Sequence, residues 1–314
     1  MKSTIKVKGL TRKFGDLVAV NRVEFDVYQG EIFGFLGPNG AGKTTTVRML
    51  TGVIDPTEGT ATIQGHDIRK EGVLSRAHIA VVPEEANVYR DLSVWENIML
   101  MAELHGVARH QRFREAARLL DELGLTERKK QKACELSKGL RQRVMLCAAL
   151  VTNPDILFLD EPTSGLDVQS AGLIRRVVSD LNRKGLTVFL TTHNMSEASE
   201  MCTRVAIIDK GNIVAIDTPE RLRSAMSSRQ FVEVRFGGIM PGYEELESLP
   251  GVSQIDANNG VFRLYTESPG HVLTEVIRLA DRRGLEIRDL CNRKPSLEDV
   301  FLHFTGGQKE NPVQ

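Results

Sequence analysis

The spacing of apolar residues along the first part of the chain predicts β-strands. Apolar and polar residues alternate over residues 5–7 and 23–27, which is the pattern of half-buried strands. Further strands are expected at residues 32–36, 60–63 and 79–82. The pattern therefore predicts a small antiparallel layer, followed by strands of a second sheet.

Two helices are expected after these strands. Ser93 and Glu96 form a capping box that would start a helix over residues 94–105. Gly124 would end a second helix, whose apolar face has the spacing i, i+3, i+4 and i+7 at Phe113, Ala116, Ala117 and Leu120. For the cores of both helices, a plain helical insert is the interpretation we favour.

The last third of the chain has its own order of elements. Strands are expected at residues 231–236, 252–256, 261–265 and 285–290, the middle two joined by a turn at Asn259-Gly260, and helices at 243–249 and 271–283. The order β-α-β-β-α-β is that of ferredoxin-like α+β domains. We therefore predict a first domain over residues 1–219, an accessory domain over 220–306 and a tail over 307–314.

The C-terminal domain is expected to begin and end with short helices. The first would cover residues 221–226, and the last would start at Ser296 with Asp299 as its capping partner. An apolar stripe on the last helix comprises Leu297, Val300, Phe301 and Phe304. Packing within the chain is favoured for this stripe, and a dimer contact is the alternative.

Composition narrows the class of protein. The 314 residues suffice for about two domains, and 41 basic against 41 acidic residues give no positive excess that would favour nucleic acid. The four cysteines lie far apart without a C-x-x-C pair, so a disulfide framework or zinc site is not expected and a reducing cytoplasm fits. The longest apolar run, residues 144–151, is shorter than the ~20 residues of a membrane span, so a soluble chain is expected.

Candidate chemistry begins directly after the strand at residues 32–36. The pattern G-x-x-x-x-G-K-[ST] there comprises Gly37, Pro38, Asn39, Gly40, Ala41, Gly42, Lys43 and Thr44, followed by Thr45. Backbone N–H groups of such a loop and the start of the next helix point at an anion. Lys43 would meet the β- and γ-phosphates of ATP, and Thr44 would offer its hydroxyl to Mg²⁺. An ordinary strand-to-helix turn is the alternative, but chance must then also supply both flanking elements.

A second apolar strand, residues 156–159, delivers two carboxylates at its carboxyl end. Asp160 suits the holding of Mg²⁺ through water, and Glu161 suits the orientation or deprotonation of the attacking water. Taken alone, such a pair is more often a solvated strand end. In a chain that already contains a phosphate loop, the catalytic interpretation is favoured.

Between these two motifs lies LSKGLRQR, residues 136–143. Ser137 is placed to cap a helix that begins at Lys138, with Gly139 removing bulk beside it, although a plain N-cap explains Ser137 equally well alone. The segment resembles the signature LSGGQxQR of the ABC (ATP-binding cassette) ATPases. It differs at Lys138 and Leu140 and keeps Ser137 and Gly139.

The resemblance covers about residues 3–218 and implies a fold and an activity. The fold is an α/β P-loop NTPase cassette, with a mostly parallel sheet, an antiparallel β subdomain and a helical subdomain over about residues 84–137. The activity is ATP hydrolysis with Mg²⁺. In such proteins two chains stack head to tail, and Ser137 of one chain would then close the ATP held by Lys43 of the other.

Four further residues receive roles from the resemblance. Phe14 lies about where the family stacks an aromatic ring on adenine, although a core or surface role is as compatible with the sequence. Glu84 occupies the Q-loop position, normally Gln, and keeps an oxygen ligand for Mg²⁺ or water. Asp167 ends the D-loop between two nucleotide sites, and His193 matches the switch histidine that contacts the γ-phosphate.

The tail segment PSLEDVFLHFTG, residues 295–306, resembles drug-resistance ATPases that serve ABC-2 exporters. This implies a cytoplasmic ATPase subunit at the inner face of the membrane, working with an integral membrane permease as a homodimer or with a related ATPase. One alternative is a soluble ABC ATPase acting on nucleic acid or ribosomes, which the single cassette and neutral charge disfavour. Another is a small-molecule kinase, which does not explain LSKGLRQR.

Overall fold

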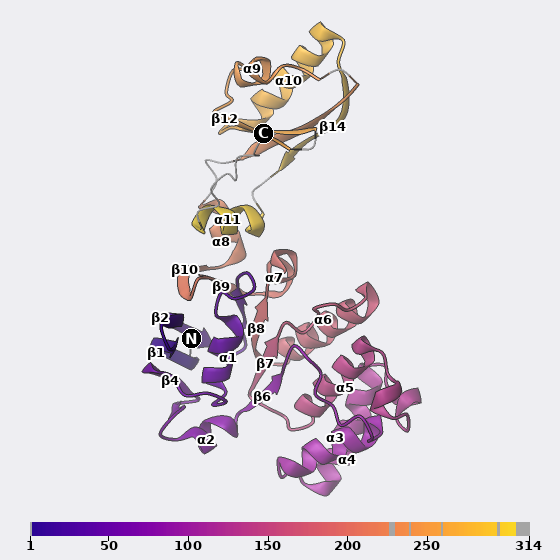
Figure 1. Ribbon diagram of the computed structural model, residues 1–314. Coiled ribbons are helices and arrows are strands. Elements are labelled where there is room, and N and C mark those ends of the chain that lie inside the picture. Colours follow the sequence, from indigo (N-terminus) through magenta and orange to yellow (C-terminus); the bar gives the residue numbers. More distant parts are fainter. Residues whose placement is uncertain (1, 226–229, 239, 259, 294–295, 306–314) are drawn as a thin grey trace. The chain divides into compact units, whose positions relative to one another are not determined.

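The computed structural model describes residues 2–225, 230–238, 240–258, 260–293 and 296–305 (Figure 1). Contacts within the chain divide it into two units, residues 1–218 and 219–314. The expected tail 307–314 and Asn259 of the expected hairpin lie outside the described residues.

Unit 1, residues 1–218, contains both strands and helices (Figure 1). Its strands are β1 (Ser3–Phe14), β2 (Leu17–Tyr28), β3 (Ile32–Leu36), β4 (Glu58–Ile63), β5 (His66–Asp67), β6 (Ile79–Val82), β7 (Ile156–Asp160), β8 (Thr187–Thr192), β9 (Arg204–Asp209) and β10 (Asn212–Asp217). Its helices are α1 (Lys43–Leu50), α2 (Gly72–Arg76), α3 (Val94–Leu104), α4 (Arg109–Glu122), α5 (Lys138–Leu150), α6 (Val168–Arg183) and α7 (Met195–Met201), with 3-10 turns η1 (Thr126–Arg128) and η2 (Ala133–Glu135).

Two sheets form the frame of unit 1. The larger has the order β10-β9-β3-β8-β7-β6, in which β9, β3, β8, β7 and β6 run parallel and β10 pairs antiparallel with β9. The smaller is the antiparallel sheet β2-β1-β4-β5. Every residue of β3, β7 and β8 is buried, because elements cover both faces of the parallel sheet. The predicted α/β fold class is confirmed.

The core between the two sheets centres on one aromatic ring. The ring centroid of Phe189, in β8, lies 5.3–6.0 Å from those of Phe25, Phe33, Phe35 and Phe158. These side chains come from β2, β3 and β7, so a single cluster joins the antiparallel sheet to the parallel one. Aromatic pairs at such distances add attraction beyond their area burial.

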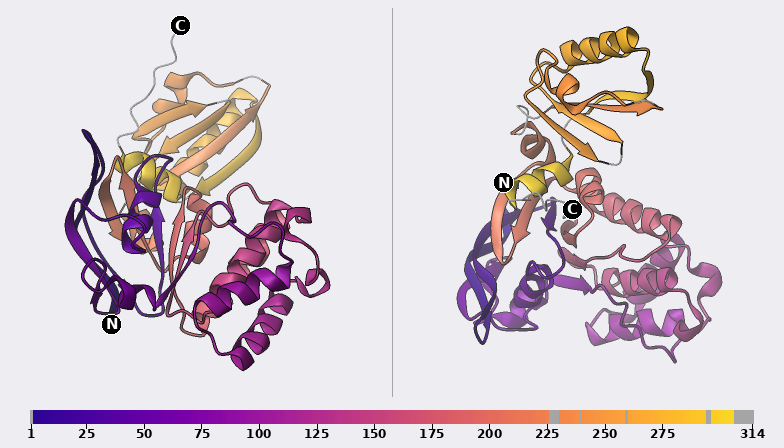
Figure 2. Two further views of the ribbon diagram at one scale, coloured as in Figure 1. Left: turned by 60° about the horizontal axis from the view of Figure 1, so that its bottom comes forward. Right: turned by 45° about the horizontal axis from the view of Figure 1, so that its top comes forward.

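Helices α3, α4 and α5 pack on one another apart from the antiparallel sheet, as both views in Figure 2 show. The capping box of Ser93 and Glu96 at the start of α3 is confirmed. The expected apolar face of α4 was partly wrong: Phe113 and Ala117 are exposed, and Leu119 is buried instead of them. The contacts of α4 with α3 and α5 decide which face of α4 is buried, and the local sequence pattern does not contain these contacts.

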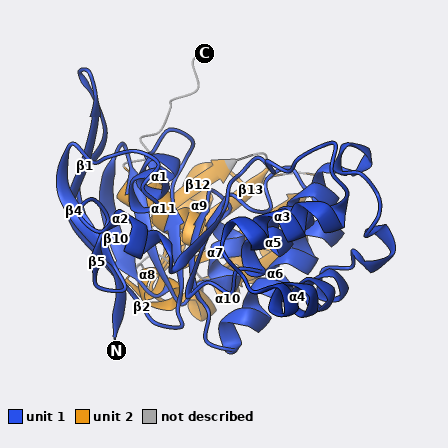
Figure 3. Ribbon diagram, turned by 90° about the horizontal axis from the view of Figure 1, so that it is seen from below, with its two compact units in different colours: residues 1–218 blue, residues 219–314 orange. Residues whose placement is uncertain are grey.

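Unit 2, which is coloured orange in Figure 3, contains the ferredoxin-like order of elements that the sequence predicted. Its elements are α8 (Pro219–Ser224), β11 (Phe231–Gly237), α9 (Tyr243–Glu247), β12 (Gln254–Asn258), β13 (Val261–Tyr265), α10 (Pro269–Arg283), β14 (Glu286–Arg293) and α11 (Leu297–Phe304). The sheet is antiparallel with the order β12-β13-β11-β14, and α10 packs against β11 and β14.

Two local predictions near the ends of the units have different outcomes. The capping box of Ser296 and Asp299 is confirmed, and α11 packs on α8 with Leu297 and Val300 buried. Phe304 of the same stripe remains exposed. The hairpin of β9 and β10 turns at Lys210 and Gly211, which both have positive φ.

We expect the substitution Phe189→Ala to lower the free energy of unfolding by about 3–5 kcal/mol, because it opens a cavity where four rings meet. The matched control is Phe113→Ala, which removes an exposed ring and should cost less than about 1 kcal/mol. Urea unfolding followed by circular dichroism measures both. Equal losses for the two variants would show that Phe189 is not the centre of the core.

Candidate functional site

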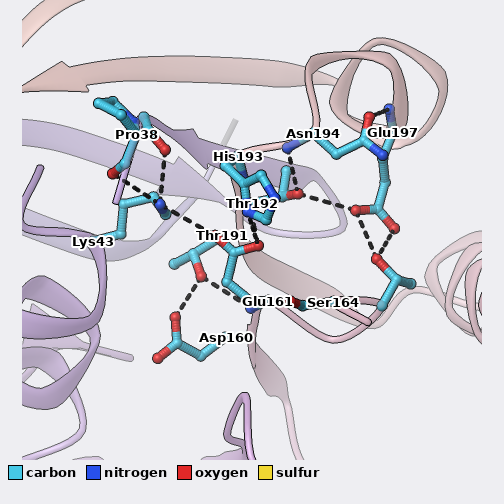
Figure 4. A network of polar contacts seen from close by, with 12 residues as sticks. Pro38, Lys43, Asp160, Glu161, Ser164, Thr191, Thr192, His193, Asn194 and Glu197 are labelled. Carbon is cyan, nitrogen blue, oxygen red and sulfur yellow. Dashed lines mark hydrogen bonds and ion pairs between the residues drawn. The ribbon is translucent and has the colours of Figure 1, made fainter. Parts of the chain in front are cut away.

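The parallel sheet brings three segments to one edge. Strands β3, β7 and β8 are neighbours in register, with Leu36 opposite Thr192 and Asp160 opposite Thr191. The segments that follow these strands therefore meet beyond their carboxyl ends, where ligands bind in open α/β sheets. Figure 4 shows Lys43, Glu161 and His193 close together at this edge.

The loop over residues 37–42 is closely packed against its neighbours. A Cβ atom on Gly37 would lie 2.3 Å from the carbonyl oxygen of Ile208, and one on Gly42 would lie 2.6 Å from that of Ala19. Gly42 also has a φ of +107°, which favours glycine. No side chain caps the start of α1, so its first N–H groups stay open to an anion.

Lys43 is buried and is held by three oxygens. Its Nζ donates to the carbonyl oxygens of Gly37 at 2.7 Å and Pro38 at 3.1 Å, and it lies 3.1 Å from Oε1 of Glu161. A buried ammonium group needs such partners, since it has lost its water shell. The lysine thus connects the loop after β3 to the carboxylate after β7.

Glu161 lies between Lys43 and His193. Its Oε2 is 2.8 Å from Nδ1 of His193, whereas the contact of Oε1 with Lys43 is an ion pair without hydrogen-bond geometry. The backbone N–H of Glu161 donates to the carbonyl and hydroxyl oxygens of Thr191, both at 3.1 Å. Its φ of +50° is uncommon for a residue with a side chain, so the backbone turns sharply at the strand end.

Asp160 and Thr44 form a second pair of oxygens beside this group. Thr44 Oγ1 donates to Asp160 Oδ1 at 3.3 Å, and Thr191 Oγ1 donates to the same carboxylate oxygen. A carboxylate and a hydroxyl are the hard ligands that Mg²⁺ accepts. Within the described ranges no cluster of three or more His, Cys, Asp or Glu side chains could hold a metal. The pair therefore fits a Mg²⁺ whose other ligands are phosphate oxygens and water.

Ser137, Gly139 and Asp167 belong to a separate group. The exposed Ser137 caps α5, and its Oγ accepts from the backbone N–H of Leu140. Asp167 caps α6 and accepts from the N–H and the hydroxyl of Ser170, which lowers the pKa of Asp167. A Cβ atom on Gly139 would lie 2.5 Å from Ser170 Oγ, so the two helix starts pack directly on each other. Lys138 joins them further by donating to the Ser164 carbonyl at 2.7 Å.

Two other expected site residues lie outside both groups. Phe14 is half exposed at the end of β1, with the guanidinium of Arg12 4.5 Å from its ring centroid. Glu84 is exposed on the segment after β6 and, among the described residues, has no hydrogen bond or ion pair. The neighbouring carbonyl of Pro83 accepts from the buried amide of Gln142 in α5, which ties this segment to the helix.

Sequence reasoning missed Thr191 and Glu197. Thr191 bonds both Asp160 and Glu161, and a threonine inside a buried strand was a signal that could have indicated it. Glu197 is buried in α7 and accepts from the hydroxyls of Thr163 and Thr192. Figure 4 labels Glu197 and Thr192 and marks their contact with a dashed line. No pattern near Glu197 indicated this, because Asn194 and Glu197 together have the spacing of an ordinary helix cap.

Comparisons with family models and with known proteins point to the same family. A family model for "ABC transporter" matches residues 20–164, and one for "ATP-binding protein DrrA1-3-like, C-terminal domain" matches residues 218–305. The chain is 33% identical to the linearmycin resistance ATP-binding protein LnrL of Bacillus subtilis strain 168, over 96% of this chain and 98% of that protein. It is 36% identical to the Nod factor export ATP-binding protein I of Rhizobium sp. strain N33, over 98% and 99%.

A solved structure extends the comparison to the fold. It is a dimeric ATP-binding cassette in a post-hydrolysis state, bound to ADP and phosphate. The superposition has a TM-score of 0.63 and 26% identity, and it covers 68% of this chain and 98% of that chain.

We expect Gly37→Ala to lower the free energy of unfolding by about 1–3 kcal/mol, because the new methyl group would meet the Ile208 backbone, which cannot rotate away. The control is Gly172→Ala inside α6, where nothing lies within 4 Å of the new Cβ. That variant should be more stable by about 0.5–1 kcal/mol. Thermal unfolding of both variants measures these changes in stability, and an unchanged unfolding midpoint for Gly37→Ala would contradict the close packing of the loop.

Proposed function

This chain belongs to the family of ABC transporter ATP-binding proteins, and from that premise we propose how its residues bind and hydrolyse ATP. It is the ATP-binding and hydrolysing subunit of an exporter of the ABC-2 type, since its relatives over nearly the full length are ATP-binding proteins of resistance and export. The observation that carries our assignment of roles is the contact of Lys43, Glu161 and His193 at one sheet edge.

Lys43 binds the β- and γ-phosphates of ATP. Its ammonium group already lies at the loop, and phosphate oxygens would replace the carbonyl oxygens of Gly37 and Pro38 as its acceptors. The open N–H groups at the start of α1 add further donors to the phosphates. Once Lys43 pairs with phosphate, it no longer neutralises Glu161, whose carboxylate becomes available to water.

Glu161 then acts as the general base or orienting group for the attacking water. Its Oε1 has no hydrogen bond within the described residues, and its Oε2 is fixed by His193. The imidazole of His193 is half exposed, so it can reach toward the γ-phosphate while Nδ1 stays with Glu161. Thr44 and Asp160 would hold Mg²⁺, which when bound neutralises charge on the β- and γ-phosphates.

The residues Ser137 and Asp167 act on the nucleotide of a second chain. Within the described part of the chain, neither has a hydrogen bond or ion pair with Lys43, Glu161 or His193. Ser137 is exposed at the start of a 13-residue helix, where a hydroxyl and N–H groups can meet an anion. A head-to-tail dimer, homomeric or with a related ATPase, would bring this group to the γ-phosphate held by the partner's loop.

We expect Glu161→Gln to bind ATP with Mg²⁺ but to hydrolyse it at least about a hundredfold more slowly, because an amide cannot take the proton. The trapped protein should be a dimer in ATP and a monomer without it, as measured by light scattering. The double variant with Ser137→Ala added to Glu161→Gln should form a weaker dimer. Lys43→Ala is the reference for lost nucleotide binding and should abolish ATP binding. If Glu161→Gln turns ATP over at the wild-type rate, the role of Glu161 is wrong.

We propose a membrane permease as the partner of this chain, because its relatives are named as ATP-binding proteins of resistance and export. Among the described residues, no helix has the length and apolar character that a bilayer span demands. Tyr89, Leu104 and Phe113 of the helical subdomain are exposed apolar side chains, and we propose that the permease contacts this subdomain. The ATPase would thereby be held at the cytoplasmic face of the membrane.

We predict that the tagged chain, extracted from its native membrane in mild detergent, carries an integral membrane protein with several apolar spans. A photo-crosslinker at Tyr89 should label that protein, because Tyr89 is exposed on the segment after β6. The same crosslinker at Val168, which is 84% exposed beside the D-loop, is the control and should not. Recovery of ribosomes or DNA without a membrane protein would contradict the exporter assignment.

A further inference from the structure

Glu197 has a buried carboxylate beside the site, and the proposed mechanism gives this carboxylate no role. It lies in α7 and is only 1% exposed. Its two oxygens accept from the hydroxyl of Thr163 at 2.8 and 3.0 Å, and its Oε2 also accepts from the hydroxyl of Thr192 at 3.1 Å. Burial of a carboxylate is costly unless hydrogen bonds replace its water, and these hydroxyls do so.

The local sequence does not account for this arrangement. Asn194 caps α7 by accepting from the N–H of Glu197, and a capping box would have the Glu197 carboxylate accept from the N–H of Asn194 in return. In the structure that N–H donates to Thr192 Oγ1 at 3.0 Å instead. The Glu197 carboxylate therefore binds the hydroxyls of Thr163 and Thr192 in place of the backbone N–H of Asn194.

The two threonines belong to the two segments that carry the catalytic pair. Thr163 lies two residues after Glu161, and Thr192 immediately precedes His193. The ladder between β7 and β8 ends at Asp160 and Thr191, so it does not hold the segment after Glu161, whereas Thr192 still pairs with Leu36 of β3. Glu197 supplies a connection between them just where the ladder stops.

The backbone at Glu161 makes such a connection important. A residue with a side chain stays at a φ of +50° only where its surroundings hold it there. On one side, the N–H of Glu161 is held by Thr191. On the other side, the turn continues to Thr163, whose hydroxyl is held by Glu197.

We propose that Glu197 is a positioning residue. It joins the segment after Glu161 to the segment that carries His193, and so keeps the 2.8 Å contact between Glu161 Oε2 and His193 Nδ1 in place. The inference rests on the proposed roles of Glu161 and His193 in hydrolysis. It predicts that loss of the connection slows the chemical step and leaves ATP binding intact, because within the described residues no hydrogen bond or ion pair joins Glu197 to Lys43 or to the loop over residues 37–42.

The test is steady-state ATP hydrolysis by the full chain with Glu197→Gln. The amide keeps the shape of the side chain, but its NH₂ group cannot accept a hydroxyl proton. We expect kcat to fall about tenfold to a hundredfold, with the KM for ATP within about twofold of wild type. The matched control is Glu200→Gln on the same helix, an identical change at a side chain that is 70% exposed, and its kcat should be unchanged.

Thr163→Val removes the connection from its other end and serves as the second variant if Glu197→Gln folds poorly. It should show the same loss of kcat, and the double variant should be no slower than the slower single variant, because both changes break one connection. Effects that multiply, or a wild-type kcat in Thr163→Val, would overturn the proposal. If Glu161→Gln itself hydrolyses ATP normally, the proposed function fails. If only Glu161→Gln is impaired, the role of Glu197 fails alone.

Discussion

A buried lysine is the constraint on which the candidate site depends. The ammonium group of Lys43 has little contact with water, so the fold must supply oxygens for it. Two come from the glycine loop and one from Glu161, which connects the segments after β3 and β7. The same need makes the lysine responsive to a ligand, because a triphosphate offers better acceptors than backbone carbonyl oxygens.

The steric demands of the loop account for much of the surrounding fold. Gly37 and Gly42 leave no room for a Cβ against the carbonyl oxygens of Ile208 and Ala19. The N–H of Gly211 also donates to the Ala41 carbonyl at 3.0 Å. Strands β9 and β2 therefore support the loop directly, and the phenylalanine cluster around β8 keeps those sheets together.

The candidate site residues form two groups, and within the described residues no hydrogen bond or ion pair of the chain joins one group to the other. Lys43, Glu161 and His193 form one, and the starts of α5 and α6 form the other. Hydrogen bonds hold the second group together, since Lys138 donates to the Ser164 carbonyl oxygen and Arg143 of α5 donates to Ser170 Oγ of α6. Such an arrangement suits a two-chain site, in which each chain contributes one group to each nucleotide.

The sequence alone determined what neighbouring residues encode: the phosphate loop at residues 37–45, the acid pair, the capping boxes and the α/β order of elements. It did not determine which face of α4 is buried, where Leu119 replaces Phe113, or where the carboxylate of Glu197 points. Local patterns fix conformation through bonds a few residues apart. The helices α3 and α5, on which α4 packs, and Thr163, which binds Glu197 from 34 residues away, are distant along the chain, so only the packed tertiary structure decides these contacts.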